Sequence, residues 1–563
     1  MNSLALAAIS CAALYLGYRV YGNALSRLWD VQPERRTPAH ELYDGVDYVP
    51  AKHWIVLFGH HFASIAGAGP IIGPALACAM WGWAPALLWL VLGSIFLGAV
   101  HDFSSLMASL RSQGKSIAEI AETHLGHRVR LIFGAFLWLA LVLVVAVFAQ
   151  LAAQTFVMKP QMVIPTFGLI GLALLVGMMM YTWKLPTWLG TVVGVGLLFG
   201  LLAIGFKVPV ALPWGANANM VVWMVVLLVY CYFASILPVN ILLQPRDYLS
   251  TFLLYAGVLA GYIGLALTRP NVEAPAVINF SSGIGPLWPM LFVIIACGAI
   301  SGFHSLVASG TTAKQLATEA DAKKIGYGAM IVESTVGVMA LVAVAAGLHW
   351  GAGADSYGAM LKEKGPLVTF ATGYAALSKP LLGSVGALVA LTMLNAFVLT
   401  TLDTATRITR YIGEEFFGEG LGMRWLRNRF LSTLIVVGCA FYLALGPFQT
   451  VWPVFGSANQ LIGALALLVV SVVLRRLGRP VIYTLGPAVF MLVTTMAALV
   501  YQGYAFFTGG KTLLAAISFA LLVLAVMMVA DSIRAVRRGK PEAGVGVAAE
   551  VGAEVAVAAE AGS

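Results

Sequence analysis

Charged residues are scarce in this sequence. Asp, Glu, Lys and Arg together make up 10% of its 563 residues, whereas hydrophobic residues make up 60%. A soluble protein of this size would need about a quarter charged residues to cover its surface, so most of this surface must face lipid. The apolar runs are continuous and about 20 residues long, which is typical of membrane-spanning helices rather than of barrel strands. The sequence therefore predicts an all-α polytopic membrane protein.

Cysteine is also rare, and the common catalytic motifs are missing. The five cysteines lie in apolar runs without CxxC spacing, which argues against a disulfide framework or a thiolate metal site. The sequence contains no GxxxxGK[ST], HExxH or GxSxG motif. We therefore expect neither an enzyme nor a nucleotide-driven pump, and we predict no cofactor and no resident metal ion.

The apolar runs predict about fifteen membrane spans. These lie near 3–21, 54–79, 82–108, 130–157, 163–181, 187–206, 219–242, 249–268, 287–313, 327–348, 378–402, 429–446, 451–474, 481–501 and 512–532.

The basic residues predict the orientation of these spans, because Lys and Arg accumulate in cytoplasmic loops. With the N-terminus outside, most of the 33 Lys and Arg residues fall in inside segments, including the 101–130 loop and the C-terminal tail. The largest external loop is then 349–378, and Arg246 with Asp247 is expected to fix a short cytoplasmic turn. The net charge of +9 fits attraction to anionic lipid headgroups and does not imply nucleic acid.

Four regions follow from this pattern. Residues 1–53 are predicted to form an N-terminal helix and a cytoplasmic loop, 54–474 a transporter core, and 475–539 the C-terminal helices. Residues 540–563 consist of Ala, Gly, Val and Glu repeats without a core pattern, which predicts a disordered cytoplasmic tail.

Two of the predicted spans contain helix breakers. The first reads GHHFASIAGAGPIIGP over 59–74, and the second reads SGFHSLVASGTT over 301–312. Interrupted backbone at membrane depth is tolerated beside a cavity or a partner, and a pair of interrupted spans indicates a transporter's central site. Because the two segments lie in the second and the ninth predicted spans, seven apart in order, they cross the membrane in opposite directions, as an inverted repeat requires. The alternative is that these small residues only permit close helix packing.

A helix break exposes N–H groups to an anionic substrate, and its freed carbonyls can hold a cation. The polar and glycine residues around the two breaks are therefore the candidates for substrate binding. They are His60, His61, Ser64, Gly67, Gly69, Gly302, His304, Ser305, Ser309, Thr311 and Thr312.

Coupling needs a titratable or cation-binding group inside the membrane. His61 and His304 suit proton coupling, because imidazole titrates near neutral pH. Ligation of a metal by these histidines with His101 and Asp102 remains an alternative, although the spacing matches no standard motif. The coupling candidates are His61, His304, Glu333, Thr400, Thr401 and Asp403.

Asp403 has two readings. Beside Thr400 and Thr401 it could hold Na⁺. Alternatively, it could pair with Arg407 one helical turn further on.

Several blocks resemble signature segments of the carbon starvation protein A family. The resemblance implies proton-coupled uptake of pyruvate or peptides and a five-plus-five, LeuT-like inverted repeat of the amino acid–polyamine–organocation superfamily. The two interrupted spans would be its first and sixth core helices, and two further helices would be additional to the core. The blocks are HHFASIAGAGPIIGP at 60–74, LLQPRDYL at 242–249, ACGAISGFHSLVASGTTAKQL at 296–316, NAFVLTTLDTATRITRYI at 395–412 and FGSANQLIGALAL at 455–467.

We therefore predict a secondary transporter of the inner membrane that imports pyruvate or a similar small carboxylate with a proton during nutrient limitation. Uptake of short peptides and coupling to Na⁺ are alternatives within that class. Two other classes remain open: a membrane redox protein that uses paired histidines as haem ligands, and a nutrient sensor that binds without translocating.

Overall fold

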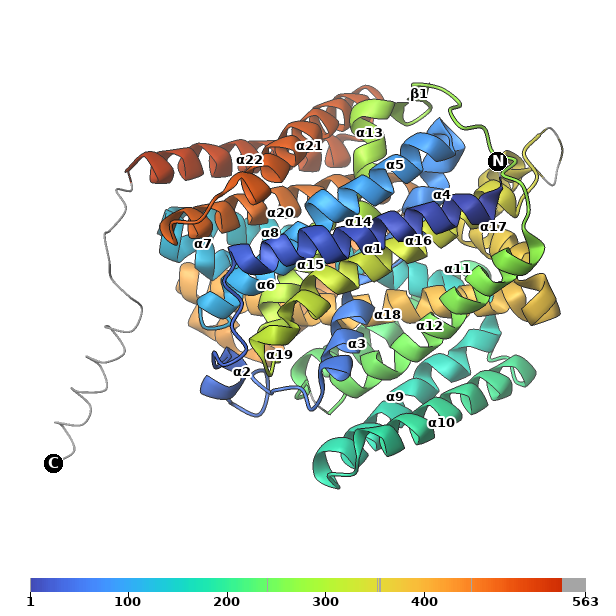
Figure 1. Ribbon diagram of the computed structural model, residues 1–563, viewed down its shortest axis with the longest axis horizontal. Helices are drawn as coiled ribbons and strands as arrows, with labels where there is room; N and C mark the ends of the chain where they lie inside the picture. The colour runs from blue at the N-terminus through green and yellow to red at the C-terminus, as the bar shows by residue number, and fades with distance from the viewer. Residues whose placement is uncertain (1, 240, 352, 354–355, 447, 539–563) are drawn as a thin grey trace.

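The computed structural model describes residues 2–239, 241–351, 353, 356–446 and 448–538 (Figure 1). The predicted tail 540–563 lies outside the described residues. The helices run mostly along one common direction, as expected for a chain whose apolar runs each cross a bilayer. A two-stranded hairpin, β1 (Ser281–Ser282) and β2 (Gly285–Pro286), lies in the loop before α13.

The helices have the following bounds. They are α1 Ser3–Leu28, α2 Pro38–Glu41, α3 Trp54–Ile65, α4 Gly69–Trp81, α5 Trp83–Gly93, α6 Ala99–Arg111, α7 Ile117–Leu125, α8 His127–Met158, α9 Val163–Gly177, α10 Thr187–Lys207, α11 Ala216–Ile236, α12 Leu243–Thr268, α13 Leu287–Ile294, α14 Ala296–Ala299, α15 Gly302–Val307, α16 Gly328–Ala346, α17 Tyr357–Leu382, α18 Gly386–Gly413, α19 Arg429–Ala444, α20 Phe448–Arg476, α21 Ile482–Thr508 and α22 Thr512–Arg538. Short π turns include η1 Ser94–Gly98, which joins α5 to α6, η4 Ala308–Thr312, which extends α15, η6 Lys323–Tyr327 before α16, and η8 Glu414–Gly420 after α18.

The predicted fold class is confirmed. In the described part of the chain, 12 helices are long and apolar enough to cross a membrane, or 13 when the bent pair α3–α4 is one span. The two remaining predicted spans are also helical. The one at 429–446 is the short helix α19 of 16 residues, and the one at 287–313 is divided into α13, α14, α15 and η4.

The prediction of a loop over 349–378 is wrong. Most of that region belongs to α17, which packs against α12, α16 and α18, and the following span begins at Gly386 instead of 378. Lys362, Lys364 and Pro366 had interrupted the apolar pattern. Gly365, at φ 75° and ψ 173°, turns the chain just before Pro366, and the helix resumes on the other side.

Both predicted interruptions are present. In the first, Ala66 to Ala68 separate α3 from α4, and the two helices are bent by 42°. Pro70 follows at the start of α4, where its missing N–H costs no helical hydrogen bond. In the second, Ile300 and Ser301 are extended between α14 and α15.

The contacts among helices repeat in the two halves of the chain. The helices correspond in pairs: α3–α4 with α13–α15, α6 with α16, α8 with α18, α11 with α19, and α12 with α20. When the members of each pair are exchanged, the helix–helix contacts of one half become those of the other half. For example, α3 packs against α12 as α15 packs against α20, and α4 packs against α16 as α15 and η4 pack against α6.

Corresponding helices are antiparallel. Ser94 on η1 bonds Ser334 on α16, whereas Phe103, later in α6, lies against Gly326, before α16. Likewise, Thr155 near the end of α8 bonds Asn395 near the start of α18. The two halves therefore have opposite directions, which is the relation that an inverted repeat requires.

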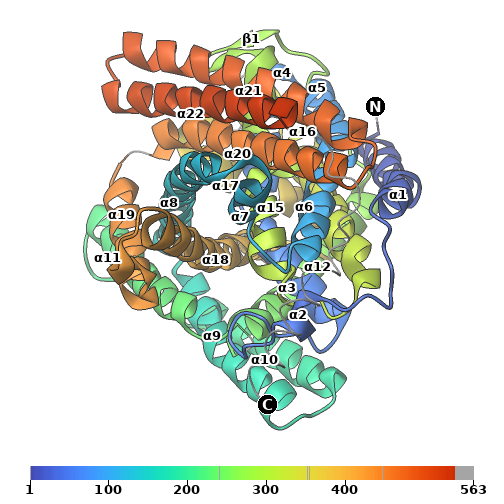
Figure 2. The same ribbon diagram turned by 90° about the vertical axis from the view of Figure 1, so that its left-hand side faces the viewer.

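Helices α9 and α10 have no counterparts in the second half. They pack against each other and form a hairpin at the edge of the molecule, seen at the bottom of Figures 1 and 2. These two helices therefore match the pair that we expected to be additional to the core.

Candidate functional site

Polar side chains are buried on two sides of α3. Its adjacent residues His60 and His61 belong to two different groups. We name these groups the His304 set (His61, His101, Asp102, His304, Glu333) and the Arg246 set (His60, Tyr230, Arg246, Asp247, Asp403). Except for the half-buried Tyr230, all of these residues are buried.

In the His304 set, one imidazole lies between two carboxylates. His304 Nδ1 is 2.9 Å from Asp102 Oδ2, and His304 Nε2 is 3.4 Å from Glu333 Oε2. The other Asp102 oxygen is 2.8 Å from His101 Nδ1. A buried carboxylate is stable when it is paired or protonated, so a proton can be held here by His304 or Glu333.

Several polar atoms of this set have no hydrogen-bond partner among the described residues. They are Nε2 of His61, His101 and His304 and both Glu333 carboxylate oxygens. Such buried atoms are rare in folded proteins, and a ligand, water or proton commonly satisfies them.

The Arg246 set contains one guanidinium and two carboxylates. Arg246 forms an ion pair with Asp403 and donates a hydrogen bond to the Tyr230 hydroxyl at 2.6 Å. That hydroxyl donates in turn to Asp403 Oδ2 at 2.7 Å. Asp247 is more weakly held by the arginine, with its Oδ1 at 3.7 Å from Nε, and its Oδ2 is 2.7 Å from Nδ1 of His60.

The two sets are joined through α3 and η4. His60 Nε2 is 3.4 Å from the Thr311 hydroxyl, and His61 Nδ1 is 2.7 Å from the Thr312 hydroxyl. Each set thus contains one histidine from α3, and that histidine contacts a threonine of η4, the turn that follows α15.

A central cavity of about 230 Å³ lies between the two helix breaks. Gly67 lines it from the first break and Ser301 from the second. No member of the His304 set is among the lining residues, but Phe303, which precedes His304 in α15, is one of them, so this set lies behind the cavity wall. The remaining lining residues are Ile65, Val144, Phe148, Cys297, Thr401, Phe455 and Asn459.

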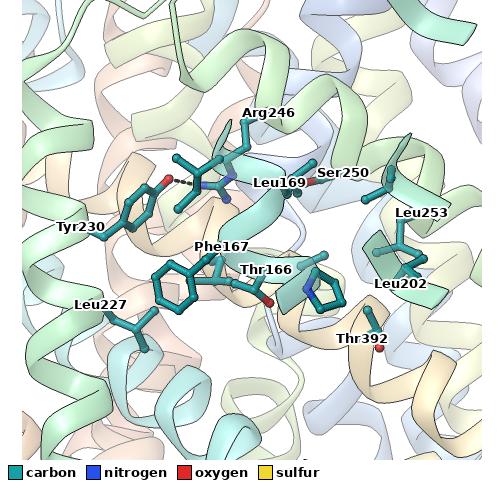
Figure 3. A pocket seen from close by; sticks show the side chains of 15 residues that line it. Thr166, Phe167, Leu169, Leu202, Leu227, Tyr230, Arg246, Ser250, Leu253 and Thr392 are labelled. Carbon is teal, nitrogen blue, oxygen red and sulfur yellow. Dashed lines mark hydrogen bonds between the residues drawn. The ribbon is translucent and has the colours of Figure 1, made fainter. Parts of the chain in front are cut away.

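A second cavity, of about 500 Å³, separates the α9–α10 hairpin from α11, α12 and α18. Its walls are mostly apolar. Arg246 and Tyr230 stand together at one side, with Thr166, Ser250 and Thr392 as further polar residues (Figure 3).

The predicted glycines fall into two kinds. Gly67 lines the central cavity. Gly69 and Gly302 lie at close helix contacts, where an added methyl group would overlap Cys297 and the backbone carbonyl of Asn459, respectively. An added methyl group at Gly67 would overlap the ring of Phe148 as well. The packing reading therefore applies to all three glycines, and the cavity reading to Gly67 alone.

The predicted hydroxyls also differ in their partners. Ser305 and Ser309 donate to carbonyls of their own helical segment, at 2.7 and 2.8 Å. Ser64 lies 3.4 Å from Asp247 and 3.1 Å from the Thr404 hydroxyl.

Thr400 and Thr401 contact the end of α3. Their hydroxyls donate to the carbonyls of Ala63 and Ser64, at 2.5 and 3.0 Å. These two threonines are thus placed where freed carbonyls of the first break could be shared with a cation.

Two expectations about charged residues are wrong. Arg246 and Asp247 are not in a cytoplasmic turn, because α12 begins at Leu243 and carries both into the protein interior. Asp403 does not pair with Arg407: its partners are Arg246 and Tyr230, and Arg407 instead forms an ion pair with Asp47 at 2.9 Å.

The loop before α3 covers the end of α18 that carries Arg407. Asp47 also accepts a hydrogen bond from the Tyr411 hydroxyl, and Lys314 lies over the rings of Tyr48 and Tyr411. Burial alone would raise the pKa of Asp47. The charge of Arg407 and the Tyr411 hydroxyl outweigh burial, so the pKa lies below its ordinary value and the carboxylate stays ionised.

Among the residues that the structure describes, no three His, Cys, Asp or Glu side chains converge in a way that could hold a metal ion. The metal alternative for His61, His304, His101 and Asp102 therefore has no geometric counterpart there.

The model of the family described as carbon starvation protein CstA matches residues 2–350 and 349–498. The chain belongs to this family. A peptide transporter CstA of Bacillus subtilis is 34% identical over 90% of this chain and 90% of its own length. In Escherichia coli, a peptide transporter CstA is 33% identical (88% and 81% covered), and the pyruvate/proton symporter BtsT is 32% identical (89% and 81% covered).

The fold is similar to that of a manganese transporter from Eremococcus coleocola. Its crystal structure, in complex with an aromatic bis-isothiourea compound, matches with a TM-score of 0.52 at 13% identity, over 88% of this chain and 99% of that one. At this identity the similarity concerns the fold alone. Family and fold together make the chain a multi-pass membrane transporter, and neither supports the redox or sensor alternatives.

Sequence reasoning missed Tyr230, Arg246 and Asp247 as parts of a buried group, and Cys297 as a cavity residue. A signal was available for two of them, because Arg246 and Asp247 lie in the LLQPRDYL block that resembles the family. By local pattern alone, a charged pair at a helix start looks like a turn between two spans.

Proposed function

We propose that this CstA family member imports pyruvate or a similarly small carboxylate together with protons, by alternating access. One observation carries the proposal: the His304 set, with titratable groups and unpaired polar atoms, lies beside a cavity between two broken helices. A transporter that couples a substrate to protons needs this adjacency, because the occupancy of one site must change the energy of the other. The relative named as a pyruvate/proton symporter supports the same assignment.

The size of the central cavity favours a small substrate. At about 230 Å³, it is less than half as large as the cavity beside the α9–α10 hairpin, which has about 500 Å³. Ser301 and Asn459, which bond each other in this conformation, supply a hydroxyl and an amide donor that would turn to a bound carboxylate. His61 and His304 would relay the proton, with Glu333 as its second acceptor.

Peptide uptake is the second candidate, because several relatives are named peptide transporters. A peptide would need a wider cavity than this conformation offers. Na⁺ coupling is the second candidate for the ion, supported by Thr400 and Thr401 at the freed carbonyls of Ala63 and Ser64.

For the location, we propose the inner membrane with the N-terminus outside and the C-terminus in the cytoplasm. The distribution of basic residues supports this orientation.

The test is uptake into proteoliposomes. Labelled pyruvate, alanine and dialanine are offered separately under an imposed pH gradient or an imposed Na⁺ gradient. We expect accumulation of pyruvate driven by the pH gradient. Accumulation of dialanine but not pyruvate would establish the peptide alternative, and accumulation that follows Na⁺ at constant pH would replace the proton.

A further inference from the structure

The Arg246 set is a second buried group of titratable residues, and the proposed function does not use it. It is separate from the His304 set: no hydrogen bond or ion pair found among the described residues joins the two directly, and they meet through the neighbours His60 and His61. It also borders a different cavity, the one beneath the α9–α10 hairpin.

The charges of this set do not balance. Arg246 carries one positive charge, whereas Asp247 and Asp403 carry two negative charges when both are ionised. An uncompensated charge in the membrane interior is costly. A proton on the His60–Asp247 pair removes the imbalance, because two cations then face two carboxylates.

The geometry shows which carboxylate takes the proton. Asp403 is fixed by the guanidinium and by the Tyr230 hydroxyl. Asp247 is 3.7 Å from the arginine but 2.7 Å from His60, and its Oδ1 lacks a hydrogen-bond partner in the described part of the chain. The imidazole and Asp247 can therefore share one exchangeable proton.

Among the described residues, no charged or titratable side chain besides His60 and Arg246 lies within ion-pair distance of Asp247. The titratable and charged groups that face this set are His60 from α3, Tyr230 and Cys231 from α11, Arg246 from α12 and Asp403 from α18. The turn η4 and the residues after it contribute the neutral side chains of Thr311 and Gln315, at 3.4 and 3.3 Å from His60 Nε2.

We infer that His60 and Asp247, poised by Arg246 and Asp403, form a second proton-binding site, so that the transporter moves one proton with each of its two buried sets. This inference rests on the proposed function. It implies about two protons per substrate. Import of a monovalent carboxylate then carries one net positive charge inward, whereas coupling through the His304 set alone would be electroneutral.

The experiment measures the proton-to-substrate ratio in proteoliposomes, for whichever of pyruvate, alanine and dialanine is transported. The reversal point of uptake is found under opposed substrate and pH gradients, with K⁺ and valinomycin setting the membrane potential. For pyruvate we expect a ratio of about two, and about 50-fold accumulation at equilibrium under about 100 mV without a pH gradient. In Asp247→Asn the ratio should fall to about one, and the dependence on potential should disappear while a pH gradient still drives uptake.

His60→Gln should give the same ratio as Asp247→Asn, because it removes the same proton. Asp30→Asn, the same substitution on a half-exposed side chain at the end of α1, is the control and should keep the wild-type ratio. If both set variants prove inactive, the wild-type ratio decides alone.

A wild-type ratio of about one, or an unchanged ratio in Asp247→Asn, would overturn the inference and leave proton-coupled transport intact. A potential-driven component that requires Na⁺ would overturn it in favour of a sodium ion at this site. The absence of any proton-coupled uptake would remove the proposed function, and this inference would fall with it.

Discussion

His304 occupies a position in which its protonation state must matter, because Asp102 and Glu333 contact its two ring nitrogens. Replacement by Gln keeps much of the size and the hydrogen bonding and removes the titration. In His304→Gln, we expect a pH gradient to drive far less accumulation than in the wild type, because only the Arg246 set can then couple a proton to the substrate. Exchange of internal for external substrate needs no net proton movement and should persist. Both are measured as labelled uptake into proteoliposomes.

Two other variants complete this experiment. His61→Gln tests the neighbouring relay, and Ser309→Ala serves as the control because that hydroxyl donates to its own helix. Full gradient-driven accumulation in both histidine variants would refute the relay and direct attention to Glu333.

At the residue scale, the sequence indicated most of the His304 set, but only His60 and Asp403 of the Arg246 set. A histidine or glutamate within an apolar run is visible as an exception to its neighbours. Arg246 and Asp247 sit between two apolar runs, which is where loops also have charges. Their partners, Asp403 and His60, lie on distant segments, so local pattern could not show that the pair is buried.

Among the elements, the contact between the two broken spans depends on glycine. A methyl group at Gly69 would overlap the Cβ and Sγ atoms of Cys297. We expect Gly69→Ala to lower the stability of the folded protein by about 1–3 kcal/mol, as overpacking usually does. The measurement is thermal unfolding in detergent. Gly200→Ala, on the exposed side of α10 where nothing lies near the new methyl group, should be neutral or slightly stabilising. Equal transition temperatures for the two variants would show that the break is not tightly packed.

The docking of helix α7 on the rest of the protein should depend on pH. Burial, with the nearby charge of Arg476, lowers the pKa of His124 to about 4. The unfolded value is about 6.5, so between these values the undocked helix binds a proton that the docked helix does not. Docking is therefore fully favourable above about pH 6.5 and weakens as the pH falls towards 4.

Hydrogen exchange over Ile117–Leu125, corrected for intrinsic rates, tests this at about pH 7 and about pH 5. Protection should drop at the lower pH in the wild type and stay level in His124→Gln. A drop of the same size in the variant would assign the effect to other groups.

Element positions were largely predictable, because a continuous apolar run needs no distant partner to become a helix. The exceptions are informative. In α17, Lys362, Lys364 and Pro366 interrupt the apolar pattern, so the sequence did not predict a helix there. That helix is stabilised by packing against α12, α16 and α18. The division of 287–313 into four pieces depends on tertiary contacts, such as that of the Asn459 carboxamide with the Phe303 N–H.

In the whole molecule, segments that the basic residues assign to opposite sides of the membrane lie at opposite ends of the helix bundle. Ser3 bonds Pro270, and Glu273 contacts His349, so the N-terminus and the start of 349–378 share one end. The loop between α6 and α7, which contains Lys115, lies at the opposite end with α7 and the end of α22 (Figure 1). The sequence could predict this division because charge asymmetry is counted over the whole chain.

Impermeant thiol labelling of intact cells tests the orientation. Single cysteines replace the exposed residues Lys115 and Lys362 in a variant without the five natural cysteines. We expect position 362 to react from outside and position 115 to react after permeabilisation. The reverse pattern would invert the proposed topology.

The glycine contacts have a mechanical consequence. At Gly69, the first broken span touches Cys297 of the second, and at Gly302 the second broken span touches the backbone of α20. Neither contact leaves space for a side chain. Sliding there would force atoms to overlap, whereas rotation about these points would not. The contacts can therefore act as a fulcrum. A small tilt about that fulcrum is therefore the relative motion that these contacts allow between the broken spans and α20.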